Sequence, residues 1–431
     1  MSKTRILYVA HGHATIRAGG AEQHAYELYQ AMKGSDEFAP FLLARTGEPE
    51  YRPVPGSLFR AIGDDGTQVL FYTEGMDYFF HTQRDKGILT THLRDFLRAY
   101  EPEVVHFQHT IHIGIDTIRV VRNTLPDSAV VMTLHEYVYI CNAAGLMVEK
   151  GTHKPCTQAT VARCHRCFPD IEPRDFLLRE RFLKSHLNLV DRFIAPSHFL
   201  AERYKEWGLP ERKIVHIDYG RPTREPLPPR AMTNGEARSR FGYFGQLSSH
   251  KGILELLEAV SRLGERGGTF GQLFVNGANL ETQPAEFKQS FRDSLDACNG
   301  AVRDLGSYTH SEITERMALI DWVVVPSTWW ENSPLVIQEA FLHGRPVICA
   351  DIGGMKEKVL DGINGLHFRA GDVHSLAETL WRAANTPGLW ERLRDGIPRV
   401  YSMDDSVAAH SRLYRAVLDE RRVAQRDSAR E

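Results

Sequence analysis

Residues 322–340 of the chain read WVVVPSTWWENSPLVIQEA. The apolar run 322–325 predicts a buried strand, because a strand covered on both faces of a parallel sheet is apolar throughout. A polar loop follows, and Pro334 predicts the start of a helix, since proline is favoured in the first helical turn. A strand, a loop and a helix start in this order indicate one unit of a doubly wound α/β sheet.

Each half of the chain opens with the same order of elements. In the first half, residues 6–10 lead through Gly19 and Gly20 to a helix with apolar residues at three-to-four spacing. In the second half, residues 241–245 lead through a glycine-containing loop to an amphipathic helix. Further apolar runs alternate with helical patterns at residues 69–72, 104–107, 129–134, 273–275 and 346–350. We therefore predict two doubly wound parallel sheets, with ligands beyond the carboxyl ends of their strands.

The chain has 431 residues, which exceeds one ordinary compact core and predicts two domains. Closely spaced prolines exclude a helix in residues 221–237 and indicate a linker. We expect an N-terminal domain at 1–222, a C-terminal domain at 236–400, and a C-terminal helix with a tail at 401–431.

The composition is that of an ordinary globular protein, with 42% hydrophobic and 25% charged residues. A net charge of -3 excludes the broad positive field that holds nucleic acids. No apolar run is long enough for a signal peptide or a membrane span. The sequence thus predicts a cytoplasmic protein, with the inner face of the cell membrane as a second location.

Two glutamates flank the helix start that Pro334 predicts. The amides of Leu335 and Val336 lack partners within the helix, and the helix dipole adds positive charge there, so a diphosphate fits this end. Glu339 lies one helical turn beyond Leu335, where its carboxylate can accept hydrogen bonds from ribose hydroxyls. Glu331 precedes the helix and can meet a sugar beyond the phosphates. The alternative is that both are solvated surface carboxylates.

This segment resembles the E-x7-E motif of family 4 of the retaining glycosyltransferases, of the bacterial surface-glycan type. The matching residues are Pro326-Ser327, the pair Glu331 and Glu339, Gly344-Arg345-Pro346-Val347, Gly353-Gly354, Asp361-Gly362 and Asn364-Gly365. Gly19-Gly20-Ala21-Glu22 and residues 245–252 are similar to the family's two glycine loops. The resemblance implies the GT-B fold, in which two Rossmann-like domains, one on the acceptor side and one holding the donor, face each other across a cleft.

The resemblance also implies roles for single residues of the C-terminal half. Glu339 would hold the ribose and Glu331 the donor sugar, and Lys251 would neutralise the diphosphate. The phosphate and the sugar would further be lined by Gly245, Ser333, Pro334, Leu335 and Val336. Gln246 departs from the family, whose members often carry arginine there, and an amide cannot supply a charge-assisted hydrogen bond.

In the N-terminal half the implied residues are Gly19, Gly20 and His135. The glycines permit close approach of a ligand to the backbone, although a plain turn would use them too. His135 follows a strand and would touch the transferred sugar; a histidine at a strand end can also be structural.

The predicted activity is transfer of a sugar from a UDP- or GDP-sugar to a glycan or lipid-linked acceptor. The resemblance implies retention of configuration and no cofactor required for catalysis, with a donor phosphate oxygen accepting the acceptor's proton. One alternative is a nucleotide-sugar epimerase of similar fold, and another is a catalytically silent protein whose zinc-bearing insertion binds a partner.

Four of the six cysteines lie in residues 141–167, within an insertion at about 140–170. Cys141, Cys156, Cys164 and Cys167 suit tetrahedral, structural zinc. Alternatively they are reduced thiols, or His153 or His165 replaces one of them. Residues 174–190 predict an amphipathic helix, which packs on its own domain or contacts an anionic membrane.

Overall fold

The structure is a computed structural model that describes residues 3–16, 19–47, 57–223, 225–233, 236–265, 270–309 and 311–428. The chain divides into two compact units. The N-terminal unit comprises residues 1–151, 156–222 and 401–431, and the C-terminal unit comprises residues 152–155 and 223–400.

An eight-stranded sheet forms the middle of the N-terminal unit. Its strands are β1 (Thr4–Ala10), β2 (Phe38–Thr46), β3 (Phe59–Ile62), β4 (Gln68–Tyr72), β7 (Val104–Phe107), β8 (Ala129–Thr133), β9 (Arg192–Ala195) and β10 (Ile214–His216). They lie in the order β10-β9-β8-β7-β1-β2-β4-β3, and all pairs are parallel except β3 with β4. The chain leaves β1 toward β2 on one side and returns to β7 on the other. The order in which strands are added therefore reverses between β1 and β7, and doubly wound sheets bind ligands at such a point.

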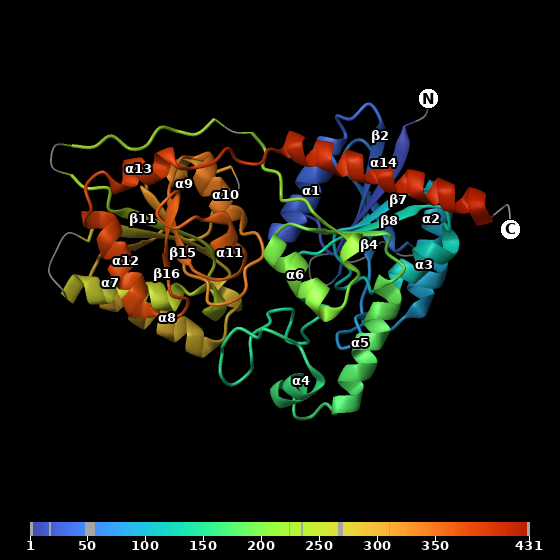
Figure 1. Ribbon diagram of the computed structural model, residues 1–431, viewed down its shortest axis with the longest axis horizontal. Coiled ribbons are helices and arrows are strands. Elements are labelled where there is room, and N and C mark those ends of the chain that lie inside the picture. Colours follow the sequence, from blue (N-terminus) through green and yellow to red (C-terminus); the bar gives the residue numbers. More distant parts are fainter. Residues whose placement is uncertain are drawn as a thin grey trace. The chain divides into compact units, whose positions relative to one another are not determined.

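Helices and short elements complete this unit (Figure 1). They are α1 (Gly20–Met32), α2 (Arg94–Tyr100), α3 (Thr117–Thr124), α4 (Val161–Cys167), α5 (Pro173–Leu187), α6 (His198–Trp207), α14 (Met403–Ser428), the π-helix η1 (Ile88–Leu93), the 3-10 helix η2 (Glu211–Lys213), and the hairpin of β5 (Met76–Asp77) and β6 (Thr82–Gln83). The core lies between sheet and helices and includes Tyr8, Leu28 and Val131, all fully buried.

The last helix, α14, belongs to the N-terminal unit although it follows the C-terminal unit in sequence. It packs along α1, as Figure 1 shows. The hydroxyl of Tyr414 hydrogen-bonds to that of Tyr8 at 3.2 Å and lies 2.7 Å from Nδ1 of His106, and all three side chains are buried. The helix continues to Ser428.

The C-terminal unit contains a six-stranded sheet that is parallel throughout. Its strands are β11 (Arg240–Gln246), β12 (Gln272–Ala278), β13 (Val302–Asp304), β14 (Trp322–Val325), β15 (Val347–Ala350) and β16 (Gly365–Phe368). Its helices and turns are α7 (Ile253–Glu265), α8 (Ala285–Ala297), α9 (Ile313–Ala318), α10 (Leu335–Leu342), α11 (Gly353–Lys358), α12 (Val373–Asn385), α13 (Leu389–Asp395), η3 (Ser249–Lys251) and η4 (Leu280–Thr282). The strand order is β13-β12-β11-β14-β15-β16, so the order in which strands are added reverses between β11 and β14.

The two doubly wound parallel sheets predicted from the sequence are confirmed. Among the described residues, the proline-rich segment contains no helix. Nor does the described part of the chain contain a helix that is both long and apolar enough to cross a membrane.

Candidate functional site

Two loops of the C-terminal unit meet beyond the ends of β11 and β14, the two strands between which the strand order reverses. The amide of Thr328 donates to the carbonyl of His250 at 3.0 Å, which joins the two loops. Gly252 has φ +71°, and a Cβ there would lie 1.9 Å from the carbonyl oxygen of Pro326. Only glycine permits this contact, so Gly252 brings the loop after β11 against the loop after β14.

Glu331 lies in the second loop and accepts three hydrogen bonds on one oxygen, Oε1. The donors are Nζ of Lys251 at 2.5 Å, Oγ of Ser327 at 2.7 Å and Nε1 of Trp329 at 2.9 Å. The side chain is 6% exposed. In the part of the chain that the structure describes, nothing donates to the other oxygen, Oε2. One oxygen thus holds the carboxylate in place and the other can meet a ligand.

The charge of Lys251 keeps Glu331 ionised. Burial alone would raise the pKa of Glu331, but the ammonium of Lys251 and the hydrogen bonds from Ser327 and Trp329 outweigh burial, and the pKa lies below its ordinary value. Lys251 is more exposed than Glu331, since its side chain keeps 28% of its surface. It therefore neutralises Glu331 while part of it faces solvent.

Trp329 contacts both members of this ion pair. Its indole N–H donates to Glu331, and Nζ of Lys251 lies 5.3 Å from the centre of its ring, within the range of cation–π attraction. Burial and the charge of Lys251 lower the pKa of the neighbouring His250. The sequence did not reveal Ser327 or Trp329 as partners of Glu331, because loop residues carry no periodic signal.

Gly353 and Gly354 hold the backbone of Glu331 and Asn332. The amide of Gly354 donates to the carbonyl of Glu331 at 2.7 Å. A Cβ on Gly354 would lie 1.4 Å from the carbonyl oxygen of Asn332, and Gly353 has φ +58°. These glycines accordingly permit the first turn of α11 to pack directly against the loop.

Helix α10 begins as predicted, with Pro334 as its N-cap and Leu335 and Val336 in its first turn. Its dipole places partial positive charge at this end. Ser333 and Glu339 are both buried, with 5% and 8% of their surface exposed. The predicted carboxylates, Glu331 and Glu339, are therefore not solvated surface groups.

Gly245 and Gln246 end strand β11, at the edge where the two loops meet. The carbonyl of Gln246 accepts the hydroxyl of Tyr243 at 2.6 Å, whereas its side chain is exposed. The structure brings Lys251 and Glu331 together and places Gly245 and Gln246 on the adjoining strand end.

In the N-terminal unit, both ring nitrogens of His135 have partners within the same unit. Nδ1 lies 2.6 Å from the hydroxyl of Tyr219, and Nε2 lies 3.2 Å from Oε1 of Gln108. Since an amide oxygen accepts, Nε2 carries the proton and Nδ1 accepts from Tyr219. Burial, followed by the charges of nearby histidines, holds the pKa of His135 well below its usual value. His135 is thus a neutral imidazole.

Two histidine–carboxylate pairs that the sequence analysis missed lie beyond the ends of β1 and β7, where the strand order of the N-terminal sheet reverses. His11, which follows β1, lies 3.0 Å from Glu22, and His109, which follows β7, lies 2.9 Å from Glu136. The rings of His11 and His109 are 4.6 Å apart. Inspection of both strand ends at this reversal point would have indicated them, whereas a lone histidine after a strand carries no signal of its own.

Gly19 is the N-cap of α1 and Gly20 is the first residue of that helix. A Cβ on Gly19 would lie 2.4 Å from a carboxylate oxygen of Glu22, and one on Gly12 would lie 3.2 Å from its Cγ. The absence of side chains at these glycines gives room for the Glu22 carboxylate.

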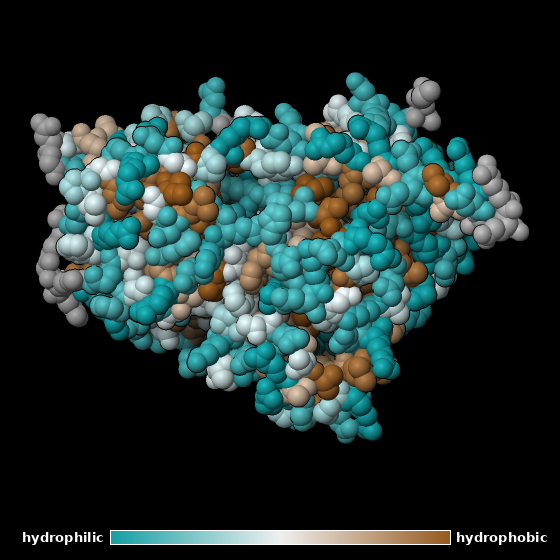
Figure 2. All heavy atoms as spheres, in the orientation of Figure 1, coloured by the Kyte–Doolittle hydropathy of each residue, from teal (hydrophilic) through white to brown (hydrophobic). Residues whose placement is uncertain are grey.

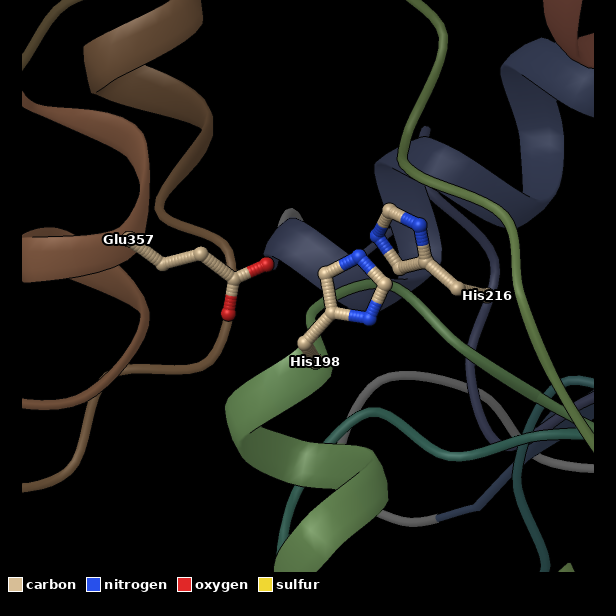
Figure 3. A group of neighbouring side chains, drawn as sticks. All are labelled: His198, His216 and Glu357. Carbon is tan, nitrogen blue, oxygen red and sulfur yellow. The ribbon is translucent and has the colours of Figure 1, made fainter.

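The rings of His198 and His216 stack at 4.0 Å on the surface of the N-terminal unit, and Figure 3 shows the two side by side. His198 begins α6 and His216 ends β10. Glu357, also drawn in Figure 3, lies on α11 of the C-terminal unit. Two imidazoles supply only part of the ligand set that a metal ion needs, so no site is assigned to the pair.

Two family models match the chain. The model described as "Glycosyltransferase Family 4" matches residues 18–224, and the model described as "Glycosyl transferases group 1" matches residues 238–386. Each half thus matches a model of glycosyltransferases.

Curated relatives support the same activity. The lipopolysaccharide 1,2-N-acetylglucosaminetransferase of Salmonella typhimurium is 25% identical over 64% of this chain and 62% of its own. The D-inositol 3-phosphate glycosyltransferase of Corynebacterium aurimucosum is 27% identical over 61% of this chain and 62% of its own. The chain therefore spans less than two thirds of the length of these relatives.

Solved structures show the same fold at low identity. Sucrose-phosphate synthase from Thermosynechococcus elongatus has a TM-score of 0.72 at 17% identity, covering 97% of this chain and 100% of its own. Anabaena Alr3699/HepE in complex with UDP has a TM-score of 0.65 at 15% identity, covering 96% and 100%. These likenesses confirm the GT-B fold.

Proposed function

From the premise that the chain is a family 4-like glycosyltransferase with the GT-B fold, we propose that it transfers a sugar from a nucleoside-diphosphate donor to a glycan or lipid-linked acceptor. The donor binds where β11 and β14 end in the C-terminal unit, and the sugar keeps its anomeric configuration. The reaction requires no cofactor.

The hydrogen bonding of Glu331 carries this proposal. Keeping a buried carboxylate ionised costs free energy, because burial penalises charge. A buried, ionised Glu331 that is fixed through Oε1 therefore indicates a functional role. Its second oxygen accepts a hydroxyl of the donor sugar. Asn332 and Ser333 continue the chain from this sugar contact to the start of α10.

The diphosphate binds at the start of α10. The amides of Leu335 and Val336 donate to phosphate oxygens, and Glu339, on the same helix, holds the ribose. Charge builds up on the diphosphate as the bond to the sugar breaks, and fixed amide dipoles stabilise this charge without reorganising. Lys251 adds a positive charge, which interacts with both the leaving diphosphate and Glu331.

The pairing of Lys251 with Glu331 has a consequence for the strength of donor binding. Gln246 supplies no charge at the position where many family members carry arginine, so Lys251 and α10 share the work of neutralising the diphosphate. We therefore expect donor binding to depend on Lys251 more strongly than on Gln246, since a charge-assisted hydrogen bond is about twice as strong as a neutral one.

The N-terminal unit takes the acceptor, near the neutral His135 and the loop of Gly19 and Gly20. A lipid-linked acceptor would bring the enzyme to the inner face of the membrane. The apolar face of α5 is buried in its own unit, including Phe176, Leu183 and Leu187. Its other side exposes Leu177 and Leu178, and Figure 2 shows apolar surface over the part of the N-terminal unit that α5 occupies in Figure 1. Sedimentation with vesicles of anionic phospholipid tests whether this side binds them.

Neither alternative is favoured. The relatives named above are transferases, which supports transfer rather than epimerisation of free nucleotide sugars. A catalytically silent protein would have no need to keep Glu331 buried and charged.

Thermal shift with UDP, GDP and ADP, followed by donor turnover, tests the proposal. UDP is the first candidate because the structural neighbour HepE binds it. We expect one diphosphate to raise the Tm and its sugar conjugate to be slowly hydrolysed. Glu331→Gln keeps the shape of the side chain and should bind the diphosphate but not turn the sugar over. Turnover at the wild-type rate in this variant would remove Glu331 from the mechanism, and interconversion of free nucleotide sugars would support the epimerase.

A further inference from the structure

The four cysteines of the insertion have no part in the proposed transfer. All of them belong to the N-terminal unit, none is in a disulfide bridge, and each is partly buried. Cys141 and Cys156 lie in loops, and Cys164 and Cys167 lie one turn apart on the same face of α4.

The loop segments present Cys141 and Cys156 through a shared residue, Met147. The backbone amides of Ala143 and Met147 hydrogen-bond to the sulfur of Cys141. The carbonyl of Met147 accepts the amide of Cys156 at 2.6 Å. Met147 has φ +48°, a strained backbone that persists only where its surroundings impose it. Burial raises the pKa of Cys141, and these two amides oppose that effect and so favour the thiolate, the form in which cysteine binds metals.

Helix α4 brings the other two thiols to the same place. Arg163, which precedes Cys164 on α4, donates to Oγ1 of Thr157 at 3.2 Å, and its other terminal nitrogen lies 3.3 Å from a carboxylate oxygen of Glu149. Thr157 follows Cys156 and Glu149 lies two residues after Met147, so α4 lies against both loop segments. His165, on the same helix, is occupied elsewhere, since its Nδ1 lies 2.8 Å from the carbonyl oxygen of Ile171.

A buried arginine adjoins this group. Arg179 on α5 is 3% exposed and donates to the carbonyls of Phe79, Val138 and Tyr139 at 2.8 to 2.9 Å. In the described residues, no carboxylate forms an ion pair with it. Its bond to the carbonyl of Tyr139 joins the guanidinium to the segment that leads into Cys141. A buried cation without a carboxylate partner is costly, so this guanidinium stabilises thiolates that form beside it.

We propose that Cys141, Cys156, Cys164 and Cys167 bind one zinc ion as four thiolates, and that Arg179 balances part of the resulting negative charge. Four thiols release four protons, and the four thiolates with Zn²⁺ carry a net charge of −2. Arg179 offsets one of these charges. The set is closed, because four protein ligands leave no position for a substrate, and the zinc is structural.

The four sulfurs must move closer together when they bind the ion. No three of these four sulfurs, all of which the structure describes, lie within 4.8 Å of one another. Sulfurs around tetrahedral zinc are about 3.8 Å apart, given Zn–S bonds of about 2.3 Å. Zinc therefore draws the loop cysteines toward α4. Because Arg179 also holds the carbonyls of Val138 and Tyr139, the ion stiffens the segment that follows His135 and Glu136.

Metal analysis of the full chain, purified without chelators, tests this proposal independently of the transfer reaction. We expect one zinc per chain, released when a mercurial reagent modifies the thiols. Cys164→Ser should lose the zinc, whereas Cys298→Ser, which changes a buried cysteine of the C-terminal unit, should keep it. If Cys164→Ser does not fold, the zinc content and mercurial release of the wild-type chain decide.

Three results would overturn the proposal. The first is a wild-type chain with no metal. The second is iron with acid-labile sulfide and visible absorption, which would indicate an iron–sulfur cluster instead. The third is zinc retained at full stoichiometry in a folded Cys164→Ser chain.

Discussion

Acid should destabilise the N-terminal unit through its buried histidines. Burial holds the pKa of His24 and His106 well below the ordinary value, and lowers those of His81 to about 3 and His410 to about 4. These side chains are at most 4% exposed. The folded chain therefore keeps them neutral in conditions where the unfolded chain takes up protons.

The sign follows from proton linkage. An unfolded histidine has a pKa of about 6.5, so the unfolded state binds more protons between about pH 6.5 and pH 4, and stability falls as the pH falls through this window. From pH 7 to pH 5, a histidine with a folded pKa of 3 to 4 costs about 2 kcal/mol. His81 and His410 together cost about 4 kcal/mol, a large part of the 5–15 kcal/mol that stabilises a typical domain, as order-of-magnitude figures.

Native-state hydrogen exchange at pH 7 and pH 5, corrected for the intrinsic effect of pH on exchange, measures each unit separately. Peptides from β1, β7 and α14 should lose several kcal/mol of protection. His410→Gln cannot titrate, so its loss should be smaller by about 2 kcal/mol, whereas the exposed His374→Gln should behave as wild type. Equal protection at both pH values in wild type, or an equal loss in His410→Gln, would refute the reasoning.

Two further predictions concern the loop that carries Glu331. Trp329→Phe removes the indole N–H from Glu331, and a hydrogen bond to a charged group contributes about 1.5–3 kcal/mol. We therefore expect kcat/KM for donor turnover to fall about 10- to 100-fold while the circular dichroism stays unchanged. An unchanged rate contradicts the positioning role. Gly354→Ala places a Cβ against the carbonyl of Asn332 and should abolish the thermal shift with diphosphate, whereas Gly264→Ala on α7, which meets nothing within 4 Å, should preserve it. A full shift in Gly354→Ala would show that the loop can move without loss of binding.

The sequence predicted the sheets because each strand followed by a loop and a helix carries its own signal. Runs such as 322–325 are apolar throughout and glycines mark the loops after them. Strand β2 was missed because its apolar residues are interrupted by Pro40 and Arg45, and the neighbouring β1 decides that it is a strand. Short edge strands such as β13 have three residues and depend on the strand beside them.

The sequence placed Lys251 and Glu331 in one site but not in contact. Their pairing depends on Gly252 resting against Pro326, a contact between residues far apart in the chain that no local pattern reports. For the same reason the pairs of His11 with Glu22 and His109 with Glu136 were missed, since each joins two separate elements. Local patterns thus indicate which residues lie at strand ends, and packing decides which of them meet.

Helix α14 has a consequence for biosynthesis. A nascent chain emerging from the ribosome exposes β1 to β10 long before residues 403–428 are made, so Tyr8 and His106 must wait for Tyr414 while the whole C-terminal unit is translated. The first unit to be synthesised is therefore the last to be finished. A product cut short after the second sheet would carry an open apolar surface, the feature by which chaperones and proteases recognise incomplete chains.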